Sequence, residues 1–475
     1  MKKLYIGLAG VFLLLLIAAI VGWSSLQRYA NSTAIPNEVE LSSWSIGGMD
    51  ISAFEKELTQ RIKELEQTPV TFTFPKTQVS PVSTTLDKLG VYYQAQPLLE
   101  ALKQLQAGSL WDRIEARRSF KKDWTLNFTW DNQVWKQRFH AQWEIQTFGK
   151  PVDATRTITK DDKVTYTPDQ SVYRLDRIQM EQVIRVAIPS EWQEGDALNI
   201  EVPLVKQEAA VTVQSLKDEG IDRKIIEIST YLKPGDAGRI HNVVSAAKTI
   251  NNMVLKPGDI FDYEKVIAET EKEYGFQEAP VIFNGKLVPG IGGGICQVSS
   301  TLYNAALRTG LEVVERRNHS LPVAYLPIGL DATFSEGYIN FRFKNTTGKN
   351  LLIRTSAENN QLIIKLFGTM EKNVSYKMET KTVQIIQPTV KYVKNASLPV
   401  GSQETIQKGK QGYKVESYRI KLVDGKEVSR EKMYVDTYKA QPTLIATNSG
   451  GQNPSSEKPS NPEPILEDGV NGPNF

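Results

Sequence analysis

Cys296 is the residue of this chain best suited to chemistry. It is the only cysteine among 475 residues, and it follows three consecutive glycines in the stretch PGIGGGICQVSSTLYNAAL. Residues 297–309 carry apolar side chains at a helical spacing, and Gly310 is a natural helix stop. Cys296 is therefore expected at the first turn of a helix. The partial positive charge of that helix end would lower the pKa of the thiol and favour the reactive thiolate.

The glycines before the cysteine suit acyl transfer. The free N–H groups of a first helical turn point to where an oxyanion develops when a carbonyl is attacked. Glycine lets the backbone bend sharply into the helix and approach a substrate closely. We expect Cys296 as the nucleophile, with Gly293, Gly294 and Gln297 binding the substrate or its oxyanion.

A cysteine nucleophile of this kind needs a base. The chain has three histidines, and His319 lies 23 residues after Cys296, directly after a predicted strand. We expect His319 to take the thiol proton and Asp331 to orient its ring, as in other catalytic triads. His241 is the competing base, because it opens a helix of the same domain, and Asn318 is the alternative orienting residue.

Structural interpretations of the same residues stay open. A buried cysteine at a helix end is often inert packing, a histidine often caps a strand, and an aspartate before Ala-Thr is often a turn residue. The GIGGG stretch lacks the strand, helix and downstream acid of a dinucleotide site. Three scattered histidines and one thiol predict no metal site, and no cofactor is expected.

The N-terminus predicts a membrane anchor. Lys2 and Lys3 precede about twenty uncharged residues, long enough to cross a hydrocarbon core of roughly 30 Å. The positive start predicts a cytoplasmic N-terminus, so residues 1–23 form a single-pass anchor, residues 24–35 a polar stalk, and residues 30–475 lie outside the cytoplasm. A late-cleaved signal peptide is the alternative. An unpaired cysteine in an extracytoplasmic protein indicates either an intermolecular disulfide or a free reactive thiol.

Length and composition predict a multidomain α+β protein. A chain of 475 residues exceeds the size of a single core, and its net charge of +3, from 57 basic and 54 acidic residues, gives no sign of nucleic-acid binding. We expect α+β modules over residues 36–205 and an α+β domain over residues 217–370. An all-β module over residues 380–450 and a disordered tail over residues 451–475 complete the prediction.

Several ordered motifs resemble the VanW domain. They are NVVSAAKTINNMVLKPGDIFDYEKVI, YGFQEAPVI, GGGICQVSSTLYNAAL, VVERRNHSLPVAYLPIGLDATF and INFRFKNTTG, spanning about residues 235–368. Residues 36–205 loosely resemble the peptidoglycan-binding modules that precede such domains, with WSIGGMDIS as the clearest motif. Residues 380–450 resemble the five-glycine (G5) β module associated with cell-wall glycans.

The resemblance implies a cell-wall protein that binds peptidoglycan stem peptides and glycan. Some VanW-domain proteins are peptidoglycan transpeptidases that make L,D cross-links through a catalytic cysteine, which corresponds here to Cys296. The histidine and aspartate of the family's HS.PV.Y.P.G.DAT motif correspond to His319 and Asp331. The same residues would serve hydrolysis, and the alternative from another class is a non-catalytic wall-binding or envelope accessory protein. The motif GRIHN departs from the NR..N of many members, which leaves His241 poorly supported.

Overall fold

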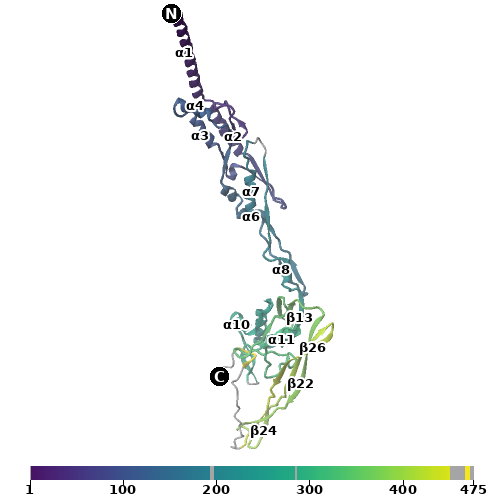
Figure 1. The fold of residues 1–475 in the computed structure, drawn as a ribbon. Coiled ribbons are helices and arrows are strands. Elements are labelled where there is room, and N and C mark those ends of the chain that lie inside the picture. The colour runs from purple at the N-terminus through teal and green to yellow at the C-terminus, as the bar shows by residue number, and fades with distance from the viewer. Residues whose placement is uncertain (1, 193–196, 284–285, 450–465, 471–475) are drawn as a thin grey trace. The chain divides into compact units, whose positions relative to one another are not determined.

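The computed structural model describes residues 2–192, 197–283, 286–449 and 466–470, which form two compact units. The first contains residues up to 153 and residues 169–210; the second contains residues 154–168 and the described residues from 211 onward (Figure 1). Both units mix helices with strands, so the predicted α+β class is confirmed.

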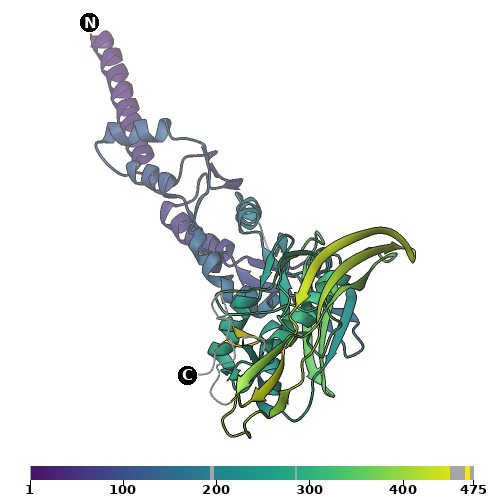
Figure 2. The same cartoon turned by 90° about the horizontal axis from the view of Figure 1, so that it is seen from below.

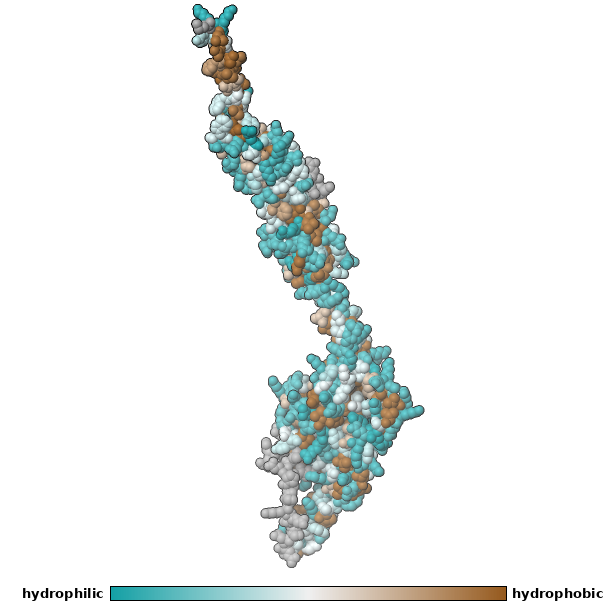
Figure 3. Space-filling view, in the orientation of Figure 1, coloured by the Kyte–Doolittle hydropathy of each residue, from teal (hydrophilic) through white to brown (hydrophobic). Residues whose placement is uncertain are grey.

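Helix α1 (Lys2–Ala30) contains the predicted membrane segment. Its apolar side chains form the brown stretch near the N-terminus in Figure 3. Its 29 residues rise about 44 Å, more than the roughly 30 Å of a hydrocarbon core. The helix continues through residues 24–30, so this part of the predicted polar stalk is helical. The sequence SSLQRYA contains neither glycine nor proline to break the helix, and Ala30 is buried at its end.

The first unit surrounds an apolar core with small sheets and short helices. Asp50 caps α2 by accepting hydrogen bonds from the N–H groups of Ser52 and Ala53, as its place before an amphipathic run predicts. The sheets have the orders β2-β1-β6, β11-β3-β4, β5-β7 and β10-β12. The elements are β1 (Glu40–Leu41), β2 (Trp44–Ser45), α2 (Ile51–Glu66), β3 (Pro69–Thr73), β4 (Val82–Thr85), η1 (Asp87–Leu89), β5 (Val91–Gln94), α3 (Gln96–Gln104), α4 (Leu110–Arg118), β6 (Asp123–Trp124), β7 (Asn127–Trp130), α5 (Asn132–Arg138), α6 (Ala141–Phe148), β10 (Val172–Leu175), α7 (Arg177–Ala187), β11 (Leu198–Glu201) and β12 (Leu204–Gln207).

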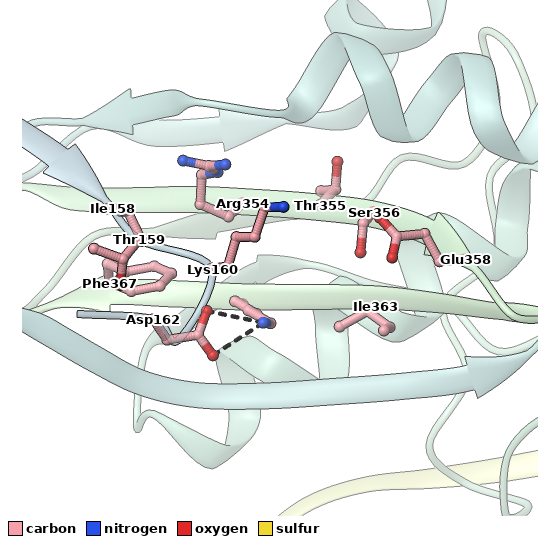
Figure 4. A pocket seen from close by; sticks show the side chains of 11 residues that line it. Ile158, Thr159, Lys160, Asp162, Arg354, Thr355, Ser356, Glu358, Ile363 and Phe367 are labelled. Carbon is pink, nitrogen blue, oxygen red and sulfur yellow. Dashed lines mark hydrogen bonds and ion pairs between the residues drawn. The ribbon is translucent and has the colours of Figure 1, made fainter. Parts of the chain in front are cut away.

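The hairpin of β8 (Thr155–Ile158) and β9 (Val164–Thr167) belongs to the second unit. The expected module over residues 36–205 is therefore interrupted. Asp162 at the hairpin accepts hydrogen bonds from Lys224 Nζ (2.6 Å) and Lys365 Nζ (2.8 Å), which attaches the hairpin to the neighbouring sheet. A groove of about 470 Å³ lies between the hairpin and this sheet (Figure 4). None of the residues that line the groove belongs to the site described below.

The second unit is built on an antiparallel sheet of order β13-β21-β20-β14, against which α9 and α11 pack. Two smaller sheets, β15-β19-β18 and β17-β16-β28, flank this layer. The elements are α8 (Val213–Asp218), β13 (Arg223–Tyr231), α9 (Ala237–Ile250), β14 (Met253–Leu255), β15 (Ile260–Asp262), α10 (Tyr263–Tyr274), β16 (Glu278–Phe283), β17 (Lys286–Ile291), α11 (Ile295–Arg308), β18 (Glu312–Glu315), β19 (Arg342–Lys344), β20 (Leu351–Glu358), β21 (Gln361–Gly368) and β28 (Leu466–Glu467).

The predicted all-β module consists of two three-stranded sheets within the second unit, of orders β22-β25-β26 and β23-β27-β24. Figure 2 shows the long strands of the first sheet curving strongly. The strands are β22 (Val374–Ile386), β23 (Val390–Lys394), β24 (Gln403–Gln407), β25 (Gly412–Val423), β26 (Lys426–Tyr438) and β27 (Thr443–Thr447).

The prediction of a disordered tail over residues 451–475 is wrong for residues 466–470; the other residues of that range lie outside the described residues. Leu466 and Glu467 form β28, which pairs antiparallel with β16. Val470 is buried in the core of the second unit. The composition of the tail as a whole is polar, but this short segment finds backbone partners and an apolar position on the folded domain.

Gly310 tests how tightly β22 packs against the end of α11. It has φ +72°, and a methyl group there would lie 2.4 Å from the ring of Tyr376 on β22. Gly348 has a matching φ of +75° with no neighbour within 4 Å. We expect Gly348→Ala to lower the free energy of unfolding by about 1 kcal/mol through backbone strain alone. Gly310→Ala should lower it by about 2–4 kcal/mol, because overpacking adds to the strain. Urea unfolding of the detergent-solubilised full chain measures both, and equal losses would contradict tight packing.

Candidate functional site

Helix α11 carries Cys296 in its first turn and is buried along almost its whole length. Its polar residues Ser299, Ser300 and Asn304 lie on the face that meets residues 330–334, while its apolar residues join the core. Hydrogen bonds hold that segment along the helix: Asn304 Nδ2 to Leu330 O (2.7 Å), Ser299 Oγ to Ala332 O (2.7 Å), and Phe334 N–H to Cys296 Sγ (3.0 Å). The spacing of polar groups on α11 thus fixes the segment that contains Asp331.

A carboxylate occupies the N-terminal end of α11. Asp468 Oδ1 accepts hydrogen bonds from the backbone N–H of Cys296 (2.8 Å) and of Gly294 (3.2 Å). Gly294 has φ +106°, a conformation that glycine adopts without strain and that turns its N–H toward the same oxygen as the N–H of Cys296. Two backbone donors thus converge on one oxygen, which is the geometry that an oxyanion site requires.

The guanidinium of Arg239 adds a third donor group beside the N–H groups of Gly294 and Cys296. We call these three groups together the cradle. Arg239 Nη1 lies 3.4 Å from Asp468 Oδ2. Arg239 Nη2 donates to Gln297 Oε1 (3.1 Å), and the amide nitrogen of Gln297 donates to Thr230 and to the carbonyl of Tyr231. The side chain of Gln297, predicted to bind substrate, therefore positions Arg239.

Gly293 lets two backbone segments approach. A methyl group at Gly293 would lie 2.6 Å from the carbonyl oxygen of Pro280, so no larger residue fits without a shift. Its own carbonyl accepts a hydrogen bond from Asn242 Nδ2 (3.0 Å). The predicted role of Gly293 in close backbone approach thus concerns β16 of the same chain.

The expectation of a thiolate with a lowered pKa at Cys296 is wrong for this conformation. The side chain is fully buried. Burial raises the pKa of the Cys296 thiol well above its usual value, and the nearby Asp468 carboxylate raises it further, although the N–H of Phe334 acts in the opposite direction. The thiol is therefore protonated at neutral pH while Asp468 occupies the cradle.

His319 and Asp331 form a buried pair. Asp331 Oδ2 lies 2.7 Å from His319 Nδ1 and also accepts the backbone N–H of His319 (2.8 Å). Burial alone would lower the pKa of His319, but its contact with Asp331 prevails and the pKa is raised. Burial alone would raise the pKa of Asp331, but hydrogen bonds from His319 and the charges of His319 and Arg316 lower it to about 2.

Asp331 orients the imidazole ring of His319, but neither residue hydrogen-bonds to the thiol of Cys296. His319 Nε2 is buried and has no hydrogen-bond partner among the described residues. Among those residues Cys296 Sγ hydrogen-bonds to the backbone of Phe334, and no hydrogen bond joins it to His319. The structure thus brings His319 and Asp331 together in the domain of Cys296 without joining them to it.

The other carboxylate oxygen of Asp331 is held from the all-β module. Tyr438, at the end of β26, donates its hydroxyl to Asp331 Oδ1 and accepts the backbone N–H of Gly329 (2.7 Å). Arg316 Nε donates to the carbonyl of Asp331 (2.6 Å), and its Nη1 pairs with Asp436 Oδ1 (2.6 Å). The orientation of His319 therefore depends on side chains contributed by the neighbouring module.

The alternative residues are placed elsewhere. His241 Nε2 lies 3.1 Å from the carbonyl oxygen of Gly275, and His140 caps α6 in the first unit. Asn318 uses its amide nitrogen on the carbonyls of His319 and Thr437, so Asp331 is the residue that contacts the imidazole ring.

Sequence reasoning missed Arg239, Asp468 and Tyr438. Arg239 lies in the GRIHN motif. The histidine of that motif was considered as a base, but the arginine is the residue that faces the site. Asp468 lies in ILEDGV, an apolar and acidic stretch within an otherwise Pro/Asn/Ser-rich tail, which is a readable signal for a docking segment. Tyr438 has no such signal, because its role depends on the packing of two domains.

The Asp331 pair predicts a pH-dependent stability. The lowered pKa of Asp331 contributes stability above about pH 4 that is lost as the pH falls toward 2. The raised pKa of His319 contributes stability below about pH 6.5 that is lost as the pH rises through the raised value. We expect Asp331→Asn to lower the free energy of unfolding by about 2–3 kcal/mol between pH 4 and 6.5, and by less on either side. Urea unfolding at several pH values measures this. The control is Asp161→Asn, at an exposed position. A difference in the free energy of unfolding between Asp331→Asn and the wild type that stays the same at every pH would contradict the prediction.

Two domain families match the second unit. The family described as VanW like protein matches residues 238–367, and the G5 domain family matches residues 377–447. One solved structure, the G5 domain of an IgA1 protease, is 32% identical in sequence to the matched part of this chain. The match covers 16% of this chain and 88% of the chain in that structure, with a TM-score of 0.14.

Two curated proteins are similar to part of the chain. YoaR of Bacillus subtilis is 41% identical over 140 residues, which are 30% of this chain and 46% of YoaR. The vancomycin B-type resistance protein VanW of Enterococcus faecalis is 29% identical over 154 residues, which are 31% of this chain and 56% of that protein. The chain thus spans about half the length of these relatives. The resemblances of residues 235–368 to the VanW domain and of residues 380–450 to the G5 module are confirmed, and the chain carries a VanW-like domain followed by a G5 domain.

Proposed function

We propose that this chain is a membrane-anchored cell-wall protein whose VanW-like domain performs cysteine-dependent acyl transfer on peptidoglycan stem peptides. Both matched domains support a role at the cell wall. Helix α1 is long and apolar enough to hold the chain in the cell membrane. With Lys2 and Lys3 on the cytoplasmic side, the two units would face the wall.

The observation that carries this proposal is the carboxylate oxygen held by the N–H groups of Gly294 and Cys296. The nucleophile's own N–H is a common oxyanion donor in acyl-transfer enzymes, since it lies beside the atom that attacks. An oxygen bound there sits next to the thiol, in the place of the carbonyl oxygen of an acyl substrate. Arg239 supplies positive charge at the same position.

The reaction has two balanced steps. In the first, His319 takes the thiol proton, Cys296 Sγ forms a bond to the carbonyl carbon of the donor's third residue, and the bond to the terminal D-amino acid breaks. The leaving amine takes the proton from His319. In the second, an amine of a neighbouring stem attacks the thioester, the C–S bond breaks, and the amine's proton returns through His319 to the thiol. Water in place of the amine gives hydrolysis.

The roles of His319 and Asp331 follow from their contact. Asp331 holds Nδ1, so the unpartnered Nε2 is the nitrogen available for proton transfer. Productive transfer requires Nε2 to approach Sγ when substrate is bound, because the two atoms do not hydrogen-bond in this conformation. Tyr438 and Arg316 act as positioning residues through Asp331.

A second candidate function is non-catalytic binding of the wall. It is favoured by the hydrogen bond from the N–H of Phe334 to Cys296 Sγ, which gives the buried sulfur a structural role. In this case the G5 domain and the first unit hold the wall polymer, and the VanW-like domain serves as a scaffold.

Muropeptides with tetrapeptide stems separate the two functions. The detergent-solubilised full chain should yield cross-linked or trimmed products, detected by mass spectrometry. Cys296→Ala and Cys296→Ser should reduce product formation by roughly a thousandfold, since the thiolate is the nucleophile. Cys296→Ser keeps an acceptor for the N–H of Phe334, so its thermal unfolding controls for structural damage. Asp161→Asn should match the wild type. An identical product pattern with and without the thiol would eliminate the enzyme.

A further inference from the structure

The segment Leu466–Val470, which we call the strap, is held against the VanW-like domain by hydrogen bonds near both of its ends and at Asp468. Its first two residues pair with β16, and the backbone N–H of Val470 donates to Ile291 O (2.9 Å). Glu467 Oε2 accepts hydrogen bonds from the backbone N–H (2.8 Å) and the hydroxyl (3.0 Å) of Ser320, the residue after His319. The strap therefore touches both the thiol side and the imidazole side of the proposed active site.

Asp468 fills the cradle as a peptide ligand would. Its carboxylate is bound by the three groups of the cradle, and its side chain is almost fully buried. Asp468 has φ +64°, an unusual conformation for a residue other than glycine. Backbone strain of this kind persists only where the surrounding contacts impose it, and here the contact is the bound carboxylate.

The shape of the strap is that of an added strand. Extended peptides bind many domains by pairing with an exposed strand while one side chain enters a pocket. The strap pairs with β16 in this way and places the carboxylate of Asp468 in the cradle. Gly469 next to it is essential for the fit, because a methyl group there would lie 2.7 Å from Val281 Cγ1 and 2.8 Å from Ile291 O.

We propose that the strap is a built-in pseudosubstrate, which occupies the peptide site beside Cys296 with Asp468 Oδ1 in the place of an acyl oxygen, and which leaves before the reacting carbonyl of an extended peptide takes that place. The inference rests on the proposed function for the identity of the incoming peptide, a stem peptide. The blocking of the cradle stands on the contacts of the strap itself. While the strap is bound, the thiol is covered and Asp468 keeps negative charge beside it, so the protein is autoinhibited.

Cys296 is the only cysteine of the chain, so its rate of alkylation by iodoacetamide reports directly on the strap. Two variants release the strap by independent routes: Asp468→Ala removes the carboxylate from the cradle, and Gly469→Ala prevents the strap from seating. In the detergent-solubilised full chain at pH 8, both should raise the alkylation rate tenfold or more, because exposure and a lower thiol pKa act together. Asp161→Asn should react like the wild type. Folded variants that react at the wild-type rate would overturn the proposal.

Acetate tests the cradle itself. In Asp468→Ala, sodium acetate should slow alkylation relative to sodium chloride at equal ionic strength, because acetate restores a carboxylate to the three donors. Equal rates in the two salts would overturn the assignment of these three donors as a binding site for a negatively charged oxygen beside the thiol.

Amide hydrogen exchange on the wild type needs no variant. The N–H groups of Val470 and Cys296 should exchange together, through a local opening whose free energy is lower than that of global unfolding. Exchange of both only upon global unfolding would mark the strap as a permanent part of the core and overturn the proposal.

The muropeptide assay on the same variants separates the two proposals. Faster alkylation with no product in any variant would leave the strap standing and refute acyl transfer. Cys296-dependent product from the wild type, with alkylation and product unchanged in Asp468→Ala, would refute the strap and leave acyl transfer standing.

Discussion

The Asp331 carboxylate lies in the interior of the second unit, where an ion without partners costs several kcal/mol. Its charge is compensated from three directions, by the His319 ring, by the Arg316 guanidinium at 3.5 Å and by the Tyr438 hydroxyl. Each partner is itself buried, so none is free to move without exposing another unpaired group. This network sets the orientation of His319 and the docking of β26 at once.

The network makes the VanW-like domain and the G5 domain one physical unit. Tyr438 and Asp436 come from β26, while Arg316 and Asp331 come from the loop region after β18. Cation–π contacts of Arg316 with Tyr303 on α11 and Tyr434 on β26, at 5.1 and 4.9 Å, extend the same connection. A module recognised in sequence by its glycines and alternating strands therefore contributes to the orientation of a candidate catalytic histidine.

Two opposing effects act on the pKa of the Cys296 thiol, and the larger of the two determines whether the thiol is protonated. A helix N-terminus stabilises a negative charge by about 0.3–1 kcal/mol, less than one pKa unit. Full burial shifts a pKa by up to about 3–5 units in the other direction, and a neighbouring carboxylate adds to it. The expectation of a thiolate considered the helix end alone. With the strap in place, burial and Asp468 prevail.

Local patterns were enough to determine the apolar N-terminal helix, the helix with Cys296 in its first turn and the α+β class, because these depend on neighbours in the chain. The ordered motifs were enough to indicate the VanW-like and G5 domains. The tertiary structure alone decided that Asp331 lies against His319, that Tyr438 closes that pair, that Arg239 and Asp468 meet at Gly294, and that the thiol is covered. These contacts join residues up to 229 positions apart, and burial and charge pairing across such separations arise only when the whole domain packs.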